Sequence, residues 1–202
     1  MKIYDSKVAP NPRRVRVFLA EKAIDIPYEE VDIQGAANLT DDFLKKNPMG
    51  KVPVLEFDDG SCLSETVAIC RYFEEVQPEP PLFGSTPREK ADIEMWQRRV
   101  EQYLLGSIGN AFRHTSDFFA DRMTPIAEWG EFNRGEAEQA FAWLDGILAD
   151  REFVAGDSIS IADITALCAV DFGRIVKVKI KPEQTNLARW HEMMSARPSA
   201  VA

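Results

Sequence analysis

The first 78 residues alternate short strand-like and helix-like stretches, and this alternation limits the possible folds more than any other feature of the sequence. Along the chain it predicts strand, helix, strand, helix, strand, strand and helix, a pattern typical of an α/β unit. A proline-rich segment follows. Beyond it, apolar residues recur at helical spacing and no strand is indicated. The sequence therefore predicts two domains, the first α/β and the second all-α.

Turn and cap residues set the expected limits of the first elements. Asn11 as N-cap begins the first helix, Thr40 caps a short acidic helix, and Ser64 caps the last helix of the domain. Asp58-Asp59-Gly60 is a strong hairpin turn. The expected strands are 2–4, 28–33, 54–57 and 62–63.

Three apolar stripes at helical spacing mark the second half of the chain. They consist of Ile93, Trp96, Val100 and Leu104, then Phe141, Leu144 and Leu148, and finally Leu187, Trp190 and Met194. We therefore assign residues 1–78 to the α/β domain, 79–87 to a linker and 88–202 to the helical domain.

Composition excludes several classes of function. The formal net charge of -9 repels nucleic acid and anionic lipid. No apolar run approaches the ~20 residues that span a bilayer, and the N-terminus lacks the apolar core of a signal peptide, so we expect a cytoplasmic protein without nucleic-acid or membrane partners. The three cysteines and two histidines have neither the spacing of a disulfide framework nor that of a zinc site, so no metal is expected.

Val52-Pro53 stands at the start of an expected strand, where proline cannot donate to the sheet. A trans bond at a sheet edge is one explanation. A cis bond is the other, and it would turn the N–H and C=O of Val52 outward, ready to pair with an extended peptide. The residues themselves leave both explanations open.

Glu65 and Thr66 fall in the expected first turn of a helix. An acid there can simply complement the helix dipole. Alternatively, the free N–H groups and the Thr66 hydroxyl form a carboxylate site, and Glu65 holds an ammonium group beside it. The pair would then bind the charged end of an α-amino acid. Lys51 could meet a second carboxylate at the other end of a bound peptide.

Two stretches carry a family resemblance. NPMGKVPVLEFDDGSCLSETVAICRYFEE, residues 47–75, resembles the glutathione-binding half of the cytosolic glutathione S-transferases. FVAGDSISIADITALCAVDF, residues 153–172, resembles the start of the buried core helix in the family's helical domain. In it Ser160 and Asp163 form a capping box, and Ile159 and Ile164 a hydrophobic staple.

The resemblance covers the whole chain in the order of its elements, and it implies the fold and the ligand. The fold would be an α/β thioredoxin-like N-terminal domain plus an all-α C-terminal helical bundle domain. Glutathione would be the co-substrate. Its cysteinyl backbone would pair with Val52 beside a cis Pro53, its γ-glutamyl end would meet Glu65 and Thr66, and its glycine carboxylate would meet Lys51.

The family usually activates the glutathione thiol with a Tyr, Ser or Cys near the start of the first helix, and this sequence departs there. Asn11 has the right position, and its amide could donate to the thiolate or serve only as the cap. The Pro-Arg-Arg pattern resembles the fungal and bacterial subgroup related to yeast transferase two, in which a water held by the helical domain replaces the side chain. His114 could hold that water, or it could be only a solvated or capping histidine near a helix end. Arg13 and Arg14 could add positive field at the sulfur or lie solvated.

The resemblance thus implies a homodimeric glutathione transferase, active in detoxification, that joins the glutathione thiolate to small hydrophobic electrophiles. Two alternatives stay open. One is a glutathione-dependent disulfide reductase or peroxidase on the same fold. The other is a non-catalytic binding or regulatory protein that retains the scaffold.

Overall fold

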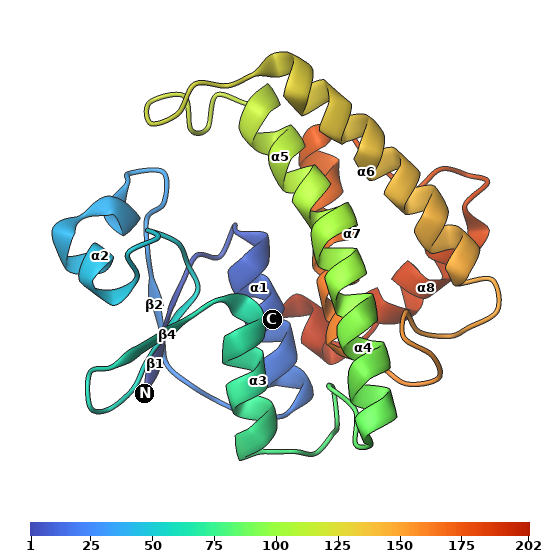
Figure 1. Ribbon diagram of the computed structural model, residues 1–202, viewed down its shortest axis with the longest axis horizontal. Coiled ribbons are helices and arrows are strands. Elements are labelled where there is room, and N and C mark those ends of the chain that lie inside the picture. Colours follow the sequence, from blue (N-terminus) through green and yellow to red (C-terminus); the bar gives the residue numbers. More distant parts are fainter. The chain divides into compact units, whose positions relative to one another are not determined.

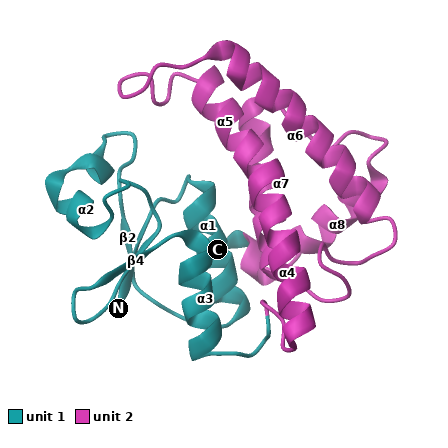
Figure 2. Ribbon diagram, in the orientation of Figure 1, with its two compact units in different colours: residues 1–81, 201–202 teal, residues 82–200 magenta.

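The computed structural model describes all 202 residues (Figure 1) and divides them into two compact units (Figure 2). The first comprises Met1–Pro81 together with Val201–Ala202, and the second comprises Leu82–Ala200. Leu82 and Phe83 are buried, and the Leu82 carbonyl accepts a hydrogen bond from the N–H of Ile161 at 2.9 Å. Part of the predicted linker, 79–87, therefore belongs to the second unit.

The first unit contains one mixed four-stranded sheet in the order β2-β1-β3-β4. Its strands are β1 (Lys2–Asp5), β2 (Tyr28–Glu30), β3 (Val54–Glu56) and β4 (Cys62–Ser64). β2 is parallel to β1, and the other neighbours are antiparallel. The strand predicted at 28–33 is shorter than expected. Its partner β1 ends at Asp5, whose carbonyl accepts from the N–H of Val31 at 2.8 Å, so the ladder has nothing further to pair with.

The helices of this unit are α1 (Pro10–Glu21), η1 (Ala37–Leu39), α2 (Asp41–Lys46) and α3 (Thr66–Val76). α1 and α3 pack side by side (Figure 1). At their C-terminal ends the Nζ atom of buried Lys22 lies 2.7 Å from a carboxylate oxygen of Glu74. Lys22 Nζ also donates to the carbonyls of Gln77 and Pro80 at 2.7 Å each. These bonds satisfy the buried ammonium and fix the two helices against each other.

Two of the predicted caps are wrong, and one is confirmed. α1 begins at Pro10, one residue before Asn11, with Ala9 as its N-cap. Ser64 stays in the sheet because it pairs with Val54, so the N-cap of α3 is Glu65. The Thr40 hydroxyl accepts from the N–H of Phe43 at 3.4 Å and caps α2 as expected.

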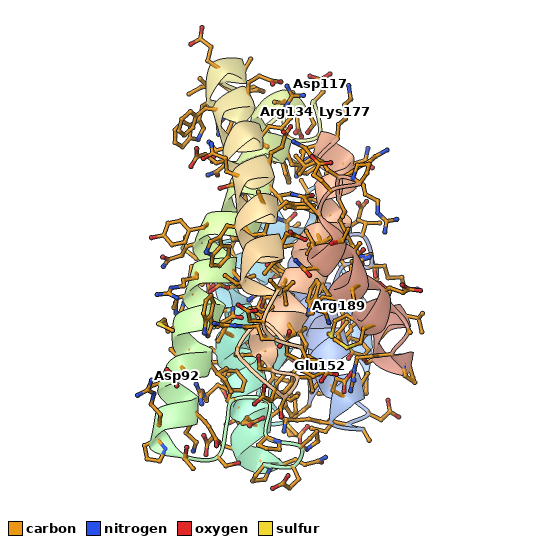
Figure 3. The ribbon with its side chains drawn as sticks, turned by 90° about the vertical axis from the view of Figure 1, so that its right-hand side faces the viewer. Asp92, Asp117, Arg134, Glu152, Lys177 and Arg189 are labelled. Carbon is orange, nitrogen blue, oxygen red and sulfur yellow. The ribbon has the colours of Figure 1, made fainter.

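The second unit is helical, as the sequence predicts. Its elements are α4 (Pro87–Arg99), η2 (Val100–Leu105), α5 (Gly106–Thr115), α6 (Ala127–Ile147), α7 (Ile161–Gly173), η3 (Arg174–Val176) and α8 (Thr185–Ser195), and a last turn, η4 (Pro198–Val201), reaches the boundary with the first unit. The predicted long helix contains a π-helical segment, η2, between α4 and α5. Figure 3 shows α6 running along this continuous helix in the opposite direction, with Asp92 toward one end of the pair and Arg134 toward the other. No helix is both long and apolar enough to cross a membrane.

α7 forms the centre of this unit, and its first ten residues, 161–170, are all buried. The Asp163 carboxylate accepts from the N–H and the hydroxyl of Ser160 at 3.0 and 2.9 Å, so the predicted pairing of these two residues is confirmed. It also accepts from the N–H of Val154 at 2.8 Å and from the indole N–H of Trp190 at 3.0 Å. One buried carboxylate thereby ties the start of α7 to the preceding loop and to α8.

Candidate functional site

The strand register brings the predicted site residues of the first unit to one edge of the sheet. This edge is the one formed by the ends of the strands, not by an outer strand. Val54 lies opposite Tyr4 on one side and Ser64 on the other, both in antiparallel pairs. The end of β1, the start of β3 and the end of β4 therefore meet at the same edge. α1 and α3 both begin just beyond it. Six of the seven predicted residues gather here: Asn11, Lys51, Val52, Pro53, Glu65 and Thr66.

Two asparagines shape the loop that leads into β3. The buried Asn47 amide donates to the carbonyl of Lys51 at 2.8 Å and accepts from the N–H of Met49 at 3.1 Å. The buried Asn38 amide donates to the carbonyl of Gly50 at 2.6 Å. Gly50 has a positive φ of 59°, a conformation that glycine adopts most readily. The backbone that presents Lys51 is therefore held on both sides.

The peptide bond between Val52 and Pro53 is cis, one of the two alternatives that the residues left open. Neither the N–H nor the C=O of Val52 makes a backbone hydrogen bond, although the residue is buried. Such groups are almost always paired in a folded protein. The edge thus offers one donor and one acceptor to an added extended peptide. Lys51, just before them, is exposed and has no ion pair.

The start of α3 combines anion-binding and cation-binding groups. The N–H groups of Thr66, Val67 and Ala68 have no backbone partner, as expected for a first turn. Thr66 is buried, and its hydroxyl is not hydrogen-bonded within the chain. Glu65 is exposed, carries no ion pair, and has a φ of 73°. A glutamate held in this region is strained, and such residues cluster at functional sites.

The first turn of α1 offers few amide donors, because Pro10 and Pro12 have no N–H. Asn11 lies between them, and its N–H has no partner in the backbone. Its side-chain oxygen accepts from a guanidinium N–H of buried Arg14 at 3.1 Å. Arg14 is therefore not the solvated surface residue that one sequence alternative described. Tyr4, in contrast, lies within β1, and its hydroxyl donates to Glu56 at 2.8 Å.

A partly buried ion pair fixes the loop between β1 and α1. Arg16 donates to the carboxylate of Asp5 at 2.6 Å and to the carbonyl of Lys7 at 3.3 Å. Burial raises the pKa of Asp5, and the adjacent Arg16 guanidinium opposes that rise. The N–H of Lys7 donates to Glu30 at 3.1 Å. The chain that leads to Asn11 is thus anchored on two sides.

The seventh predicted residue, His114, belongs to the second unit and lies at the end of α5. Its Nδ1 atom accepts from the N–H of Ile126 at 3.0 Å. A neutral imidazole that accepts at Nδ1 carries its proton on Nε2, so the ring keeps one donor. The ring therefore does not cap α5, as one sequence alternative suggested; its hydrogen bond joins the end of α5 to the chain just before α6.

A mixed four-stranded sheet with a cis proline before β3, followed by an all-helical unit, defines a thioredoxin-like N-terminal domain with a helical C-terminal domain. Family models agree. Residues 3–81 match the glutathione S-transferase N-terminal domain, and residues 130–198 match the glutathione S-transferase C-terminal domain.

Individual relatives support the same assignment. "Glutathione S-transferase 2" of Saccharomyces cerevisiae is 36% identical over 98% of this chain and 87% of its own length. A solved glutathione S-transferase domain-containing protein from Marinobacter aquaeolei superposes with a TM-score of 0.95 at 38% identity, covering 98% of this chain and 99% of that one. "Elongation factor 1-gamma" of Homo sapiens is 28% identical over 77% of this chain but only 34% of its own length. The chain belongs to the glutathione S-transferase family.

Sequence reasoning missed three features of this edge. Asn38 and Asn47 hold the loop before β3, but an asparagine beside a proline or a helix end indicates only a turn. The positive φ of Glu65 cannot be predicted from the pattern of side chains in the sequence. The contact between Arg14 and Asn11 was visible only as a spacing of three residues, which suits a helical pair without identifying one.

Proposed function

We propose that this chain conjugates the glutathione thiolate to small hydrophobic electrophiles. Lys51 binds the glycine carboxylate, and the backbone of Val52 beside Pro53 pairs with the cysteinyl residue. Thr66 and the first turn of α3 bind the γ-glutamyl carboxylate, and Glu65 binds its ammonium group. The observation that supports this most is the unpaired backbone of Val52 at the same sheet edge as the unpaired first turn of α3.

The charges of the ligand match the groups at this edge. Glutathione carries two carboxylates and one ammonium group. For the carboxylates the edge offers Lys51 and the N-terminus of α3, and for the ammonium group it offers Glu65. A helix N-terminus binds carboxylates through its free N–H groups and its dipole. A peptide laid between them as an added strand would satisfy the N–H and C=O of Val52.

In this proposal the sulfur lies at the start of α1. Asn11 donates from its backbone N–H and its side-chain amide, and the positive end of the helix dipole favours the thiolate over the thiol. The sulfur then forms a bond to an electrophilic carbon and either expels a leaving group with the bonding electrons or adds to a polarised double bond that takes up a proton. The free Nε2 donor of His114 supports its proposed role of holding a water for the thiolate.

We further propose that the protein is a homodimer. α6 and the continuous α4–η2–α5 helix expose large apolar side chains, with exposed fractions of 64% for Tyr103, 45% for Trp129 and 57% for Phe132. Trp129 and Phe132 stack with ring centroids 5.5 Å apart. Tyr103 also lines a pocket of about 380 Å³ between these helices with Trp143 of α6. An apolar face of this kind is typical of an interface, and a second copy is the partner that two-fold symmetry favours. The cytoplasmic location and a role in detoxification stay predictions.

One finding favours a second candidate function. Relatives named as elongation factor 1-gamma share about three quarters of this chain, so the same scaffold occurs in proteins that are not named as transferases. A non-catalytic binding role would also suit the lack of a Ser, Cys or Tyr at the start of α1. A disulfide reductase or peroxidase differs from the conjugating enzyme only in what the thiolate attacks.

Calorimetric titration with glutathione, followed by product analysis, separates these candidates. We expect saturable glutathione binding and a thioether product from a chlorinated aromatic substrate. Binding without turnover of any substrate, or no binding, would favour the non-catalytic scaffold. Turnover of 2-hydroxyethyl disulfide or a peroxide, without conjugation, would favour the reductase.

A further inference from the structure

The side chain of Arg14 lies buried on α1 with 1% of its surface exposed. Its Nη1 atom donates to Oδ1 of Asn11, one turn earlier, at 3.1 Å. A guanidinium is costly to bury, and long cationic side chains are rarely enclosed unless they are paired. Here the enclosed guanidinium contacts Asn11, which lies between Pro10 and Pro12 and keeps its backbone N–H.

The chemistry of this contact fixes the orientation of the Asn11 amide. A guanidinium has five N–H donors and no acceptor, so the atom of Asn11 that faces it must be the oxygen. The amide nitrogen then points away from Arg14, and no group in the chain accepts from it. Without the guanidinium the amide could rotate by half a turn and present its oxygen, which would repel a thiolate.

We infer that Arg14 is a positioning residue for the proposed reaction, because its guanidinium holds the Asn11 amide with the nitrogen directed at the glutathione sulfur. This inference rests on the proposed function of the same edge. Arg14 does not touch the sulfur in this account. It acts through Asn11, and a charge-assisted hydrogen bond is strong enough to hold an amide in one orientation.

The test measures the pKa of the glutathione thiol in the saturated complex, from the ultraviolet absorbance of the thiolate during a pH titration. Four proteins form a cycle: the unchanged chain, Arg14→Gln, Asn11→Ala and the double variant. We expect Arg14→Gln to raise the bound thiol pKa by about 1, a tenfold loss of thiolate at fixed pH. In the Asn11→Ala background the same change should add nothing, since its effect travels through the missing amide.

Arg13→Gln is the matched control, because it removes an equal charge from the neighbouring position of the same helix. It should leave the bound thiol pKa near that of the unchanged chain. Arg14→Lys keeps the charge and most of the buried length, so it provides a folded comparison if Arg14→Gln does not fold. A lysine lacks the planar fork, and we expect it to restore only part of the lowered thiol pKa.

The outcomes separate this inference from the proposed function. If the unchanged chain binds glutathione with the pKa of the free thiol, both are wrong. If the unchanged chain lowers the thiol pKa and Arg14→Gln or Arg14→Lys leaves it unaltered, only the inference is overturned. An equal rise with and without Asn11 would also overturn it, because Arg14 would then act by its charge alone.

Discussion

The indole N–H of Trp190 donates to the Asp163 carboxylate at 3.0 Å, and both side chains are fully buried. This bond joins α8 to the start of α7 across 27 residues of sequence. Burial raises the pKa of Asp163 to about 6, although Trp190, Ser160 and the N–H of Val154 all donate to it. The carboxylate thus accepts four hydrogen bonds and is still costly to ionise.

Asp163 makes the stability of the helical unit depend on pH. In an unfolded chain an aspartate has a pKa near ~3.9, so between about pH 4 and 6 the folded protein binds the proton more tightly. This contribution to stability is complete below about pH 4 and is lost as the pH rises through about 6, on the order of 3 kcal/mol. Asp163→Asn should remove that slope. It should also lower the unfolding free energy at pH 7 by about 1.5–3 kcal/mol, because the new amide NH₂ faces donors.

Urea denaturation followed by far-ultraviolet circular dichroism at pH 4, 5, 6 and 7 measures both effects. Asp157→Asn is the control, since Asp157 is an exposed acid in the same stretch, and it should shift stability by less than about 0.5 kcal/mol. If the unchanged chain and Asp163→Asn show the same dependence on pH, the role assigned to this carboxylate is wrong.

Substitution of Glu65 should weaken glutathione binding, and its effect on folding stability should depend on the new residue. Glu65→Ala and Glu65→Gly both remove the carboxylate that holds the γ-glutamyl ammonium group. Each should therefore weaken glutathione binding by about 1.5–3 kcal/mol, which raises Kd tenfold or more. The two differ in stability, because glycine tolerates the φ of 73° at this position and alanine does not. We expect Glu65→Gly to be about 1 kcal/mol more stable than Glu65→Ala.

Calorimetry gives the affinities and urea denaturation the stabilities. Glu75→Ala, at an exposed acid near the other end of α3, is the control and should leave the affinity unaltered. Unchanged glutathione binding in both Glu65 variants would remove this residue from the site.

Asn11→Ala should lower turnover far more than it lowers affinity. The side-chain amide is proposed to stabilise the thiolate, which forms after other groups have bound the tripeptide. Removal of one hydrogen-bond donor to a developing negative charge typically lowers kcat by about 10². Steady-state kinetics at varied glutathione concentration measures kcat and KM separately. An equal loss in both, or a loss of folding stability alone, would leave Asn11 with a structural role only.

Phe132→Asp should separate the proposed dimer. It places a charge beside Trp129 on the exposed apolar face of α6, where an interface would have to bury it without a partner. Light scattering at micromolar concentration should give a mass of 22.8 kDa for the variant and twice that for the unchanged chain. Ile175→Asp, at an exposed apolar residue of η3, should remain dimeric. A monomeric unchanged chain contradicts the assignment.

Much of this fold follows from local patterns in the sequence. The order of strands and helices in the first unit came from alternating periodicity, and the hairpin came from Asp58-Asp59-Gly60, where Gly60 has a φ of 83°. Ser160 and Asp163 were paired from their spacing alone, and the pairing is present. In each case the residues that determine the structure lie within a few positions of one another.

Some of the wrong predictions arise where a residue distant in the sequence decides the structure. Ser64 is a good cap by type, but Val54 on the neighbouring strand keeps it in the sheet. The helix start at Pro10 was missed because Pro12 suits a first turn equally well. Asn11 and His114 belong to different units of the chain. No local sequence pattern therefore indicates whether both stabilise the same sulfur.

A crystal structure of the protein with bound glutathione would show where the tripeptide lies. We expect two hydrogen bonds between the cysteinyl backbone and the N–H and C=O of Val52, the γ-glutamyl carboxylate on the first turn of α3, and the sulfur within hydrogen-bond distance of Asn11. A tripeptide bound elsewhere, or one that leaves the backbone of Val52 unpaired, would contradict this expectation.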